Sequence, residues 1–157
     1  DKLGAKLVFT YRKERSRKEL EKLLEQLNQS EHYLYQIDVQ SDEDVIKYAK
    51  QILDKGAQSV IVSLGGDGAI YVDRQQSIKA VNPKGKVINT VGSGDSTVAG
   101  MVAGLATGLS VQDAFKQAVA SGTATAFDAD LATKDAIENI KSQVTISVLD
   151  GEWIIWE

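Results

Sequence analysis

The chain of 157 residues contains no cysteine, one proline (Pro83) and one histidine (His32). Without cysteine it can form no disulfide, no thiolate nucleophile and no cysteine-ligated metal site. His32 lies between an expected helix and an expected strand, where we expect a surface residue, and no other residues suggest a metal site. No segment has the pattern of a signal peptide or of a membrane-spanning helix. These absences leave an ordinary globular domain in which we expect neither cysteine-based nor histidine-based chemistry.

Excess charge of either sign is also lacking. The net charge of −4 gives no general attraction to nucleic acid or to a membrane surface, and we expect neither as a partner. A hydrophobic content of 43% and a charged content of 25% are typical of a globular protein. The length suits one domain with a substantial core, so we expect a single domain over residues 1–157.

Hydrophobic periodicity predicts an alternation of strands and helices. Apolar runs predict strands at residues 7–11, 33–39 and 59–64, and helical spacing predicts helices at 16–28 and 41–55. This β-α-β-α-β order predicts right-handed crossovers and an α/β fold with a three-layer, doubly wound, mostly parallel sheet. Further helices are expected at 93–107, 110–127 and 133–142. We expect Ser41, Ser110 and Thr133 as N-caps, and Gly56 as the residue that ends the helix at 41–55.

The C-terminal residues predict a β-hairpin. Asp150-Gly151 stands between two apolar runs, 144–149 and 153–156, and this dipeptide strongly favours a hairpin turn. The run Trp153-Ile154-Ile155-Trp156 is expected to be an added strand that covers an open edge. A tag or cloning remnant is the alternative.

A glycine-rich turn at residues 92–95 carries the clearest chemical signal. Gly92 and Gly94 let the backbone turn sharply and approach a ligand, and N–H groups at the start of the following helix can bind an anion. Asp95 adds a carboxylate that could accept a proton from an attacking hydroxyl group. The alternative is a tight turn in which Asp95 only caps the helix.

The segments 63–69, 89–104, 118–126 and 142–152 resemble the ribokinase-like sugar kinases. The subgroup is that of 1-phosphofructokinase, with tagatose-6-phosphate kinase beside it. The resemblance implies that the anion hole is formed by Gly92, Ser93 and Gly94, with Asp95 as catalytic base. It also implies a hairpin over 69–81, an ATP-binding side formed by Ser63, Gly65, Gly66, Asp67 and Gly68, and an adenine border at Ser121, Gly122 and Thr125.

The first residues have a different resemblance. Segments 3–20 and 34–45 closely resemble bacterial enoyl-acyl-carrier-protein reductase, a Rossmann-fold, nicotinamide-dependent enzyme. The resemblance implies that Arg12, Lys13 and Ser16 hold the 2′-phosphate of NADP and that Asp38 contacts its adenine. A solvated run of charges at a helix start is the alternative interpretation of these residues. Both families carry a Ser-Asp-Glu-like run at a helix start, so residues 41–46 suit a crossover.

The two resemblances together predict an engineered chimera. Residues 1–46 would be reductase-like, 47–152 the nucleotide-binding half of a kinase, and 153–157 the added strand. The kinase's sugar-binding half precedes the matching region, so we expect a scaffold with no turnover that keeps a weak site for ATP with magnesium, or for a phosphate or sulfate ion. No cofactor is then required, and NADP is a weaker expectation than ATP.

Alternatives to this scaffold remain. An ATP-dependent kinase acting on fructose 1-phosphate or tagatose 6-phosphate could rebuild its site in a homodimer. A natural kinase fragment with an unusual start is another. The reductase and kinase families imply a cytoplasmic origin.

Overall fold

The computed structural model describes residues 7–11, 18, 32–36 and 41–149. The chain divides into two compact units, residues 1–48 and 49–157. This boundary follows closely on the crossover expected at residues 41–46. The single domain expected over the whole chain stays a prediction.

The described part of the first unit contains two strands, β1 (Leu7–Tyr11) and β2 (His32–Gln36). They pair in parallel, with Leu7 opposite His32 and Tyr11 opposite Gln36. Parallel neighbours require a crossover connection, which fits the β-α-β order expected here. The expected helix at 16–28 lies almost wholly outside the described residues.

Helix α2 (Asp42–Asp54) begins in the first unit and ends in the second. The hydroxyl of Ser41 accepts a hydrogen bond from the backbone N–H of Asp44 at 3.2 Å, which confirms Ser41 as the N-cap. Three acidic residues fill the first turn, where the helix dipole favours negative charge. Gly56, with φ of 108°, follows the last turn as expected.

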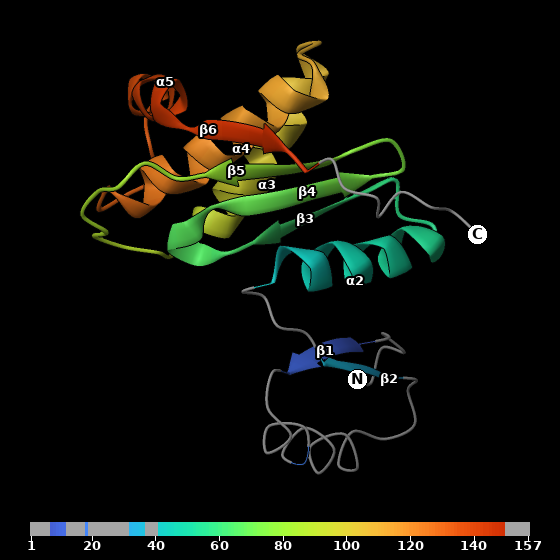
Figure 1. Cartoon of the computed structure of the whole chain (residues 1–157). Helices are drawn as coiled ribbons and strands as arrows, with labels where there is room; N and C mark the ends of the chain where they lie inside the picture. Colours follow the sequence, from blue (N-terminus) through green and yellow to red (C-terminus); the bar gives the residue numbers. More distant parts are fainter. Residues whose placement is uncertain (1–6, 12–17, 19–31, 37–40, 150–157) are drawn as a thin grey trace. The chain divides into compact units, whose positions relative to one another are not determined.

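The second unit contains a four-stranded sheet in the order β3-β4-β5-β6 (Figure 1). Its strands are β3 (Ser59–Ser63), β4 (Ala69–Asp73), β5 (Ser77–Val81) and β6 (Thr145–Val148). All three neighbouring pairs are antiparallel. The expectation of a mostly parallel sheet is therefore wrong for these strands.

Short connections explain the antiparallel pairing. A single 3₁₀ turn, η1 (Gly65–Asp67), joins β3 to β4, and three residues join β4 to β5. A parallel pair would need a connection of about a dozen residues or more. Strand β3 lies within the strand expected at 59–64, but it is half-buried and pairs antiparallel with β4 rather than in parallel. The expected hairpin over 69–81 is present, whereas the second strand of the expected C-terminal hairpin lies outside the described residues.

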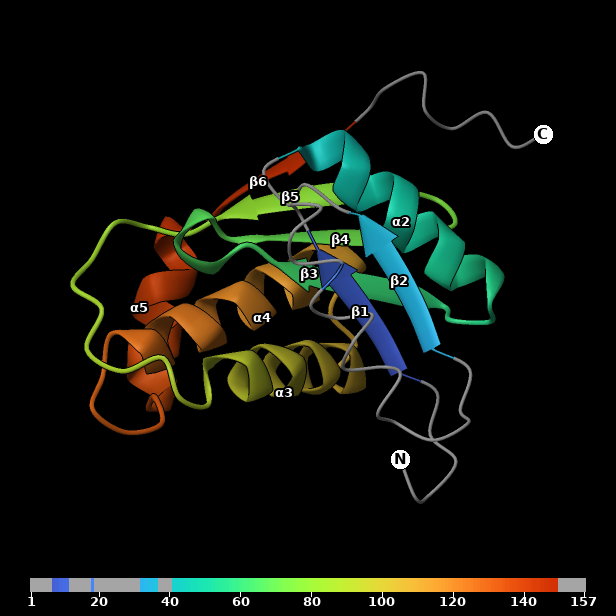
Figure 2. The ribbon, with the colours of Figure 1, turned by 90° about the horizontal axis from the view of Figure 1, so that it is seen from below.

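Three helices cover one face of this sheet, namely α3 (Ser93–Ala106), α4 (Val111–Ala126) and α5 (Lys134–Gln143). Figure 2 shows α3, α4 and α5 together below the sheet. Ser110 accepts a hydrogen bond from the N–H of Asp113, and Thr133 accepts one from Ala136, so both expected N-caps are confirmed. No helix among the described residues is long and apolar enough to cross a membrane.

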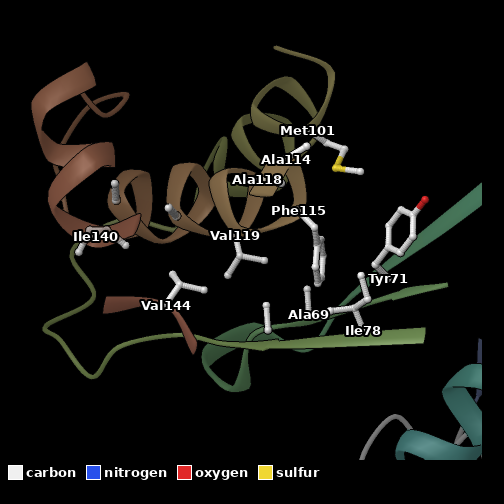
Figure 3. Packing of buried hydrophobic residues seen from close by; sticks show 13 residues of the cluster. Ala69, Tyr71, Ile78, Met101, Ala114, Phe115, Ala118, Val119, Ile140 and Val144 are labelled. Atoms are coloured by element: carbon white, nitrogen blue, oxygen red, sulfur yellow. The ribbon is translucent and has the colours of Figure 1, made fainter. Parts of the chain in front are cut away.

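The hydrophobic core lies between α4 and the sheet (Figure 3). Phe115 is fully buried and its ring centroid lies 5.6 Å from that of Tyr71 on β4. Burying a side chain of this size contributes about 1.5–3 kcal/mol. Val119 continues the same face of α4, so this helix places a fixed row of residues under the sheet. That fixed position matters because α4 also forms a wall of the candidate site.

Candidate functional site

The candidate site begins at the turn that leads into α3. Gly92 has φ of 80°, a left-handed conformation that residues other than glycine rarely adopt. As the N-cap residue it has no side chain that could bond to the N–H groups of the first turn. The N–H groups of Gly94 and Asp95 lie in the first helical turn, where no earlier carbonyl of the helix can accept their hydrogen bonds. A Cβ placed on Gly94 would meet nothing within 4 Å. The start of α3 is thus open to a ligand.

A cavity of about 560 Å³ lies beside this turn. Such a volume is within the range of small-molecule and cofactor sites. Its walls come from the β3–β4 turn, the loop between β5 and α3, the start of α3, and one face of α4. Its lining includes Gly65, Asn82, Lys84, Ser93, Gly94 and Thr123.

Ser93 has a buried hydroxyl group without a hydrogen-bond partner. Its Oγ is buried and has no hydrogen-bond partner, the single such side-chain atom among the described residues. Ser93 lines the cavity at the first position of α3. Because an unsatisfied buried hydroxyl costs about 1–3 kcal/mol, a ligand that bonds to it would recover that free energy.

Asn82 ties two walls of the cavity together. Its Nδ2 donates to the carbonyl oxygen of Gly65 at 3.0 Å, and its Oδ1 accepts from Oγ1 of Thr123 at 2.8 Å. Gly65 belongs to the β3–β4 turn and Thr123 to α4. One side chain therefore sets the distance between the turn and the helix.

Gly68 gives the β3–β4 turn its shape. Its φ is 102°, and a Cβ on this residue would overlap the carbonyl oxygen of Ala80 on β5. The N–H of Leu64 donates to the carbonyl of Gly68 at 2.8 Å and closes the turn. Only glycine fits here, and its neighbours Gly65 and Gly66 are thereby brought to the cavity wall.

The structure brings seven of the predicted site residues to this cavity, namely Ser63, Gly65, Gly66, Gly68, Ser93, Gly94 and Gly122. Gly92 forms the turn beside it, and Asp95 is exposed in the first turn of α3. Asp67 is exposed within η1 and is not among the lining residues. Arg12, Lys13, Ser16 and Asp38 lie outside the described residues.

Ser121 and Thr125 lie on another face of α4. Both line a separate cavity of about 440 Å³ between α3, α4 and α5. The hydroxyl of Thr125 donates to Ser96 Oγ at 2.9 Å, and that of Ser121 donates to the carbonyl of Gln117 at 2.9 Å. Neither residue lines the cavity beside the Gly94 turn, and their adenine contact stays a prediction.

Sequence reasoning missed the α4 residues that do line the cavity. Val119, Thr123 and Ala126 share the face of Gly122. Steps of three and four residues from Gly122 would have identified this face, since such residues are neighbours on a helix surface. Gly122 itself allows α3 and α4 to approach, because a Cβ there would overlap Oγ1 of Thr97.

The charge on the cavity lining comes from one residue. Lys84 is its one ionisable side chain; the others are apolar, hydroxyl or amide residues. No cluster of three or more acidic or histidine residues that could hold a metal ion occurs in the described ranges. The arrangement suits an anionic ligand with an apolar part.

Comparison with known proteins identifies the larger part of the chain. The sequence profile of the pfkB family carbohydrate kinases matches residues 15–136, and the chain belongs to this family. It is 40% identical over 111 residues to 1-phosphofructokinase of Bacillus subtilis, a match that covers 71% of this chain and 37% of that enzyme. A Staphylococcus aureus crystal structure described as a phosphofructokinase superposes with a TM-score of 0.71 at 63% identity, covering 94% of this chain and 42% of that one. These matches confirm the ribokinase-like α/β fold.

A second comparison concerns a different protein. A 52-residue segment is 83% identical to the NADPH-dependent enoyl-acyl-carrier-protein reductase of Staphylococcus aureus, covering 33% of this chain and 20% of the reductase. The kinase and reductase resemblances are thus both confirmed, as expected for a chimera of the two. The shares of the chain matched by the Bacillus kinase and by the reductase together exceed the whole, so these matches overlap. Overlap is expected when a junction falls in a run common to both parents. The family profile itself begins at residue 15, earlier than the expected junction.

Proposed function

We propose that the chain is an engineered chimera whose kinase-like part binds ATP, with its phosphates at the start of α3. The observation that carries this proposal is the buried, unpartnered Oγ of Ser93 in the wall of a cavity large enough for a nucleotide. The free N–H groups of the first turn add donors of the kind that bind phosphate at helix starts. The family match supports a nucleotide as the ligand.

Each wall of the cavity has a distinct task in this proposal. The turn Gly92–Asp95 holds the terminal phosphate by backbone N–H groups and Ser93 Oγ, and the β3–β4 turn lies along the phosphate chain. The α4 face at Val119, Thr123 and Ala126 borders the base. Bound ATP with magnesium supplies a transferable phosphoryl group. In this proposal Asp95 lies beside this group, and its carboxylate would accept the proton of an attacking hydroxyl.

We further propose that the 157-residue chain alone does not phosphorylate a sugar. It spans little more than a third of the length of the 1-phosphofructokinase it matches. Phosphoryl transfer depends on donor, acceptor and metal held together, and we place the acceptor-binding residues outside the matched part.

The alternative is an active ATP-dependent sugar-phosphate kinase. The observation that favours it is the 40% identity to an enzyme named 1-phosphofructokinase, which suggests fructose 1-phosphate as acceptor. It requires that two copies complete one site. Turnover of fructose 1-phosphate that Asp95→Asn abolishes, in a folded dimer, would establish this alternative and refute the inactive scaffold.

The test of ATP binding is a thermal melt with and without magnesium and ATP. A ligand that binds only the folded state adds about 2.7 kcal/mol at a hundredfold excess over its Kd, so a weak site is detectable at millimolar nucleotide. We expect a rise in melting temperature that Gly94→Val removes, because its side chain fills the space beside the donors. Ala106→Val, at the exposed end of the same helix, is the matched control and should keep the rise. No rise in the unmodified chain would refute the proposal.

A further inference from the structure

Lys84 is the one charged residue in the cavity lining, and the other lining residues are neutral. The residue lines the cavity and is exposed, so it lies at the rim, where a lysine side chain can keep its ammonium group in solvent. No hydrogen bond or ion pair occupies this ammonium group in the part of the chain that the structure describes. It is a free cation at the edge of a site that offers N–H donors from α3.

The backbone of Lys84 is held on both sides. On one side, Asn82 is bonded to Gly65 and Thr123, and Pro83 has a fixed φ. On the other side, Gly85 lies against the ring of Phe127 so closely that a Cβ on Gly85 would overlap it. Because both neighbours are anchored to cavity walls, the Lys84 side chain starts from a defined position rather than from a loose loop.

We propose that Lys84 is a specificity-determining residue that contacts the phosphate chain of the bound nucleotide and favours nucleotides with more phosphates. This inference rests on the proposed ATP site. A lysine ammonium is a compact charge that binds phosphate without demanding one geometry. Its attraction grows with the charge of the ligand, whereas contacts of the base with the α4 face do not change from AMP to ATP. Lys84 therefore separates these ligands.

The experiment compares ATP and AMP binding by titration calorimetry in three variants. Lys84→Met keeps the stem and removes the charge, and Lys84→Arg restores a cation. Lys86→Met removes a charge two residues away from a lysine that does not line the cavity, and serves as the control for general electrostatics. We expect Lys84→Met to weaken ATP binding about fivefold, the upper end for an exposed ion pair, and to leave AMP binding nearly unchanged. Lys84→Arg and Lys86→Met should bind ATP like the unmodified chain.

Salt gives a second readout that a merely structural role would not change. The ATP affinity of the unmodified chain should fall more steeply between about 50 and about 300 mM salt than the ATP affinity of Lys84→Met. Screening by salt weakens the contact that the variant lacks. Equal salt dependence would overturn the inference.

Other outcomes separate this inference from the proposal beneath it. Two outcomes would overturn the role of Lys84 and leave the ATP site standing. In one, Lys84→Met binds ATP as tightly as the unmodified chain does; in the other, Lys84→Met weakens ATP binding and AMP binding to the same extent. Equal weakening by Lys86→Met also overturns it, because position 84 is then not special. ATP binding that Gly94→Val does not disturb, or no binding by the unmodified chain, refutes the proposed site and this inference with it.

Discussion

Gly104 of α3 and Ala114 of α4 lie so close that a Cβ placed on Gly104 would be 2.9 Å from both the Cα and the Cβ of Ala114. A few residues earlier, a Cβ placed on Gly100 would likewise be 2.9 Å from the Cα of Ala118. Glycines along one face of α3 thus let its backbone rest on α4. This contact fixes the start of α3 relative to the α4 wall of the cavity.

Gly104→Val should destabilise the second unit by about 1–3 kcal/mol, the usual cost of overpacking, because α4 backbone cannot move away without disturbing the core. Urea unfolding followed by circular dichroism measures the change. Ala106→Val places the same side chain at an exposed position of α3 and should cost only a few tenths of a kcal/mol. Equal effects of the two substitutions would show that close helix packing is not the cause.

Gly68→Ala and Gly66→Ala should differ although they lie in the same turn. Gly68 has φ of 102° and no room for a Cβ, whereas a Cβ on Gly66 meets nothing within 4 Å. We expect Gly68→Ala to lower the free energy of unfolding by about 1–3 kcal/mol and Gly66→Ala to leave it nearly unchanged. Unfolding without nucleotide tests this pair, and a stable Gly68→Ala would contradict the turn geometry.

Two serines at helix starts should respond to alanine with opposite signs. Ser110 Oγ accepts a hydrogen bond from the Asp113 N–H at 3.1 Å, so Ser110→Ala should cost about 1 kcal/mol. Ser93 Oγ is buried without a partner, so Ser93→Ala should keep or raise the stability of the ligand-free chain by up to about 1 kcal/mol. The same Ser93→Ala should weaken ATP binding. A loss of stability in Ser93→Ala would show that its hydroxyl already has a partner.

We expect the folded chain to lose stability in alkali because of Tyr71. Burial, together with the hydrogen bond from its hydroxyl to Asp73 and the charge of Asp73, raises the pKa of Tyr71 from 10.0 to about 12. Between these values the unfolded chain loses the phenolic proton and the folded chain keeps it. Stability from this group is therefore complete below pH 10 and declines as pH rises towards 12.

The test for Tyr71 compares urea unfolding of the unmodified chain and of Tyr71→Phe at several pH values between about 9 and about 12, a range that includes the ordinary tyrosine pKa. The difference between the two isolates Tyr71 from the other tyrosines and the lysines. We expect this difference to shrink as pH rises. A difference independent of pH would show that the hydroxyl has the same pKa in the folded and unfolded states.

Local signals in the sequence predicted the starts of helices better than they predicted the directions of strands in the sheet. Ser41, Ser110 and Thr133 were identified as N-caps because their side-chain bonds involve only residues three positions away. The antiparallel direction of β3 could not be derived from its apolar residues, because a half-buried edge strand and a buried parallel strand can share the same composition. The direction follows instead from the short connection between β3 and β4, which leaves no length for a crossover.

The part of the candidate site that is formed by a single glycine-rich turn could be predicted from the sequence. The part that depends on contacts between separate elements could not. Gly92 and Gly94 mark the turn by residue type alone. Asn82 carries no such mark, since its role depends on Gly65 and Thr123, which are distant in the sequence and adjacent in space. The resemblance groups Ser121 and Thr125 with Gly122, but in the structure they line a different cavity, because a helix turns neighbouring residues to different faces.

The strand order of the second unit carries a consequence for how it assembles. Strands β3, β4 and β5 are consecutive along the chain, so their pairing closes only short loops. Strand β6 pairs with β5 after three helices have intervened, with Thr145 opposite Val81. Closing so long a loop is entropically costly and slow. We therefore expect the three-stranded meander to form early during folding and β6 to join last, so that until then one side of β5 is open to pairing with another chain.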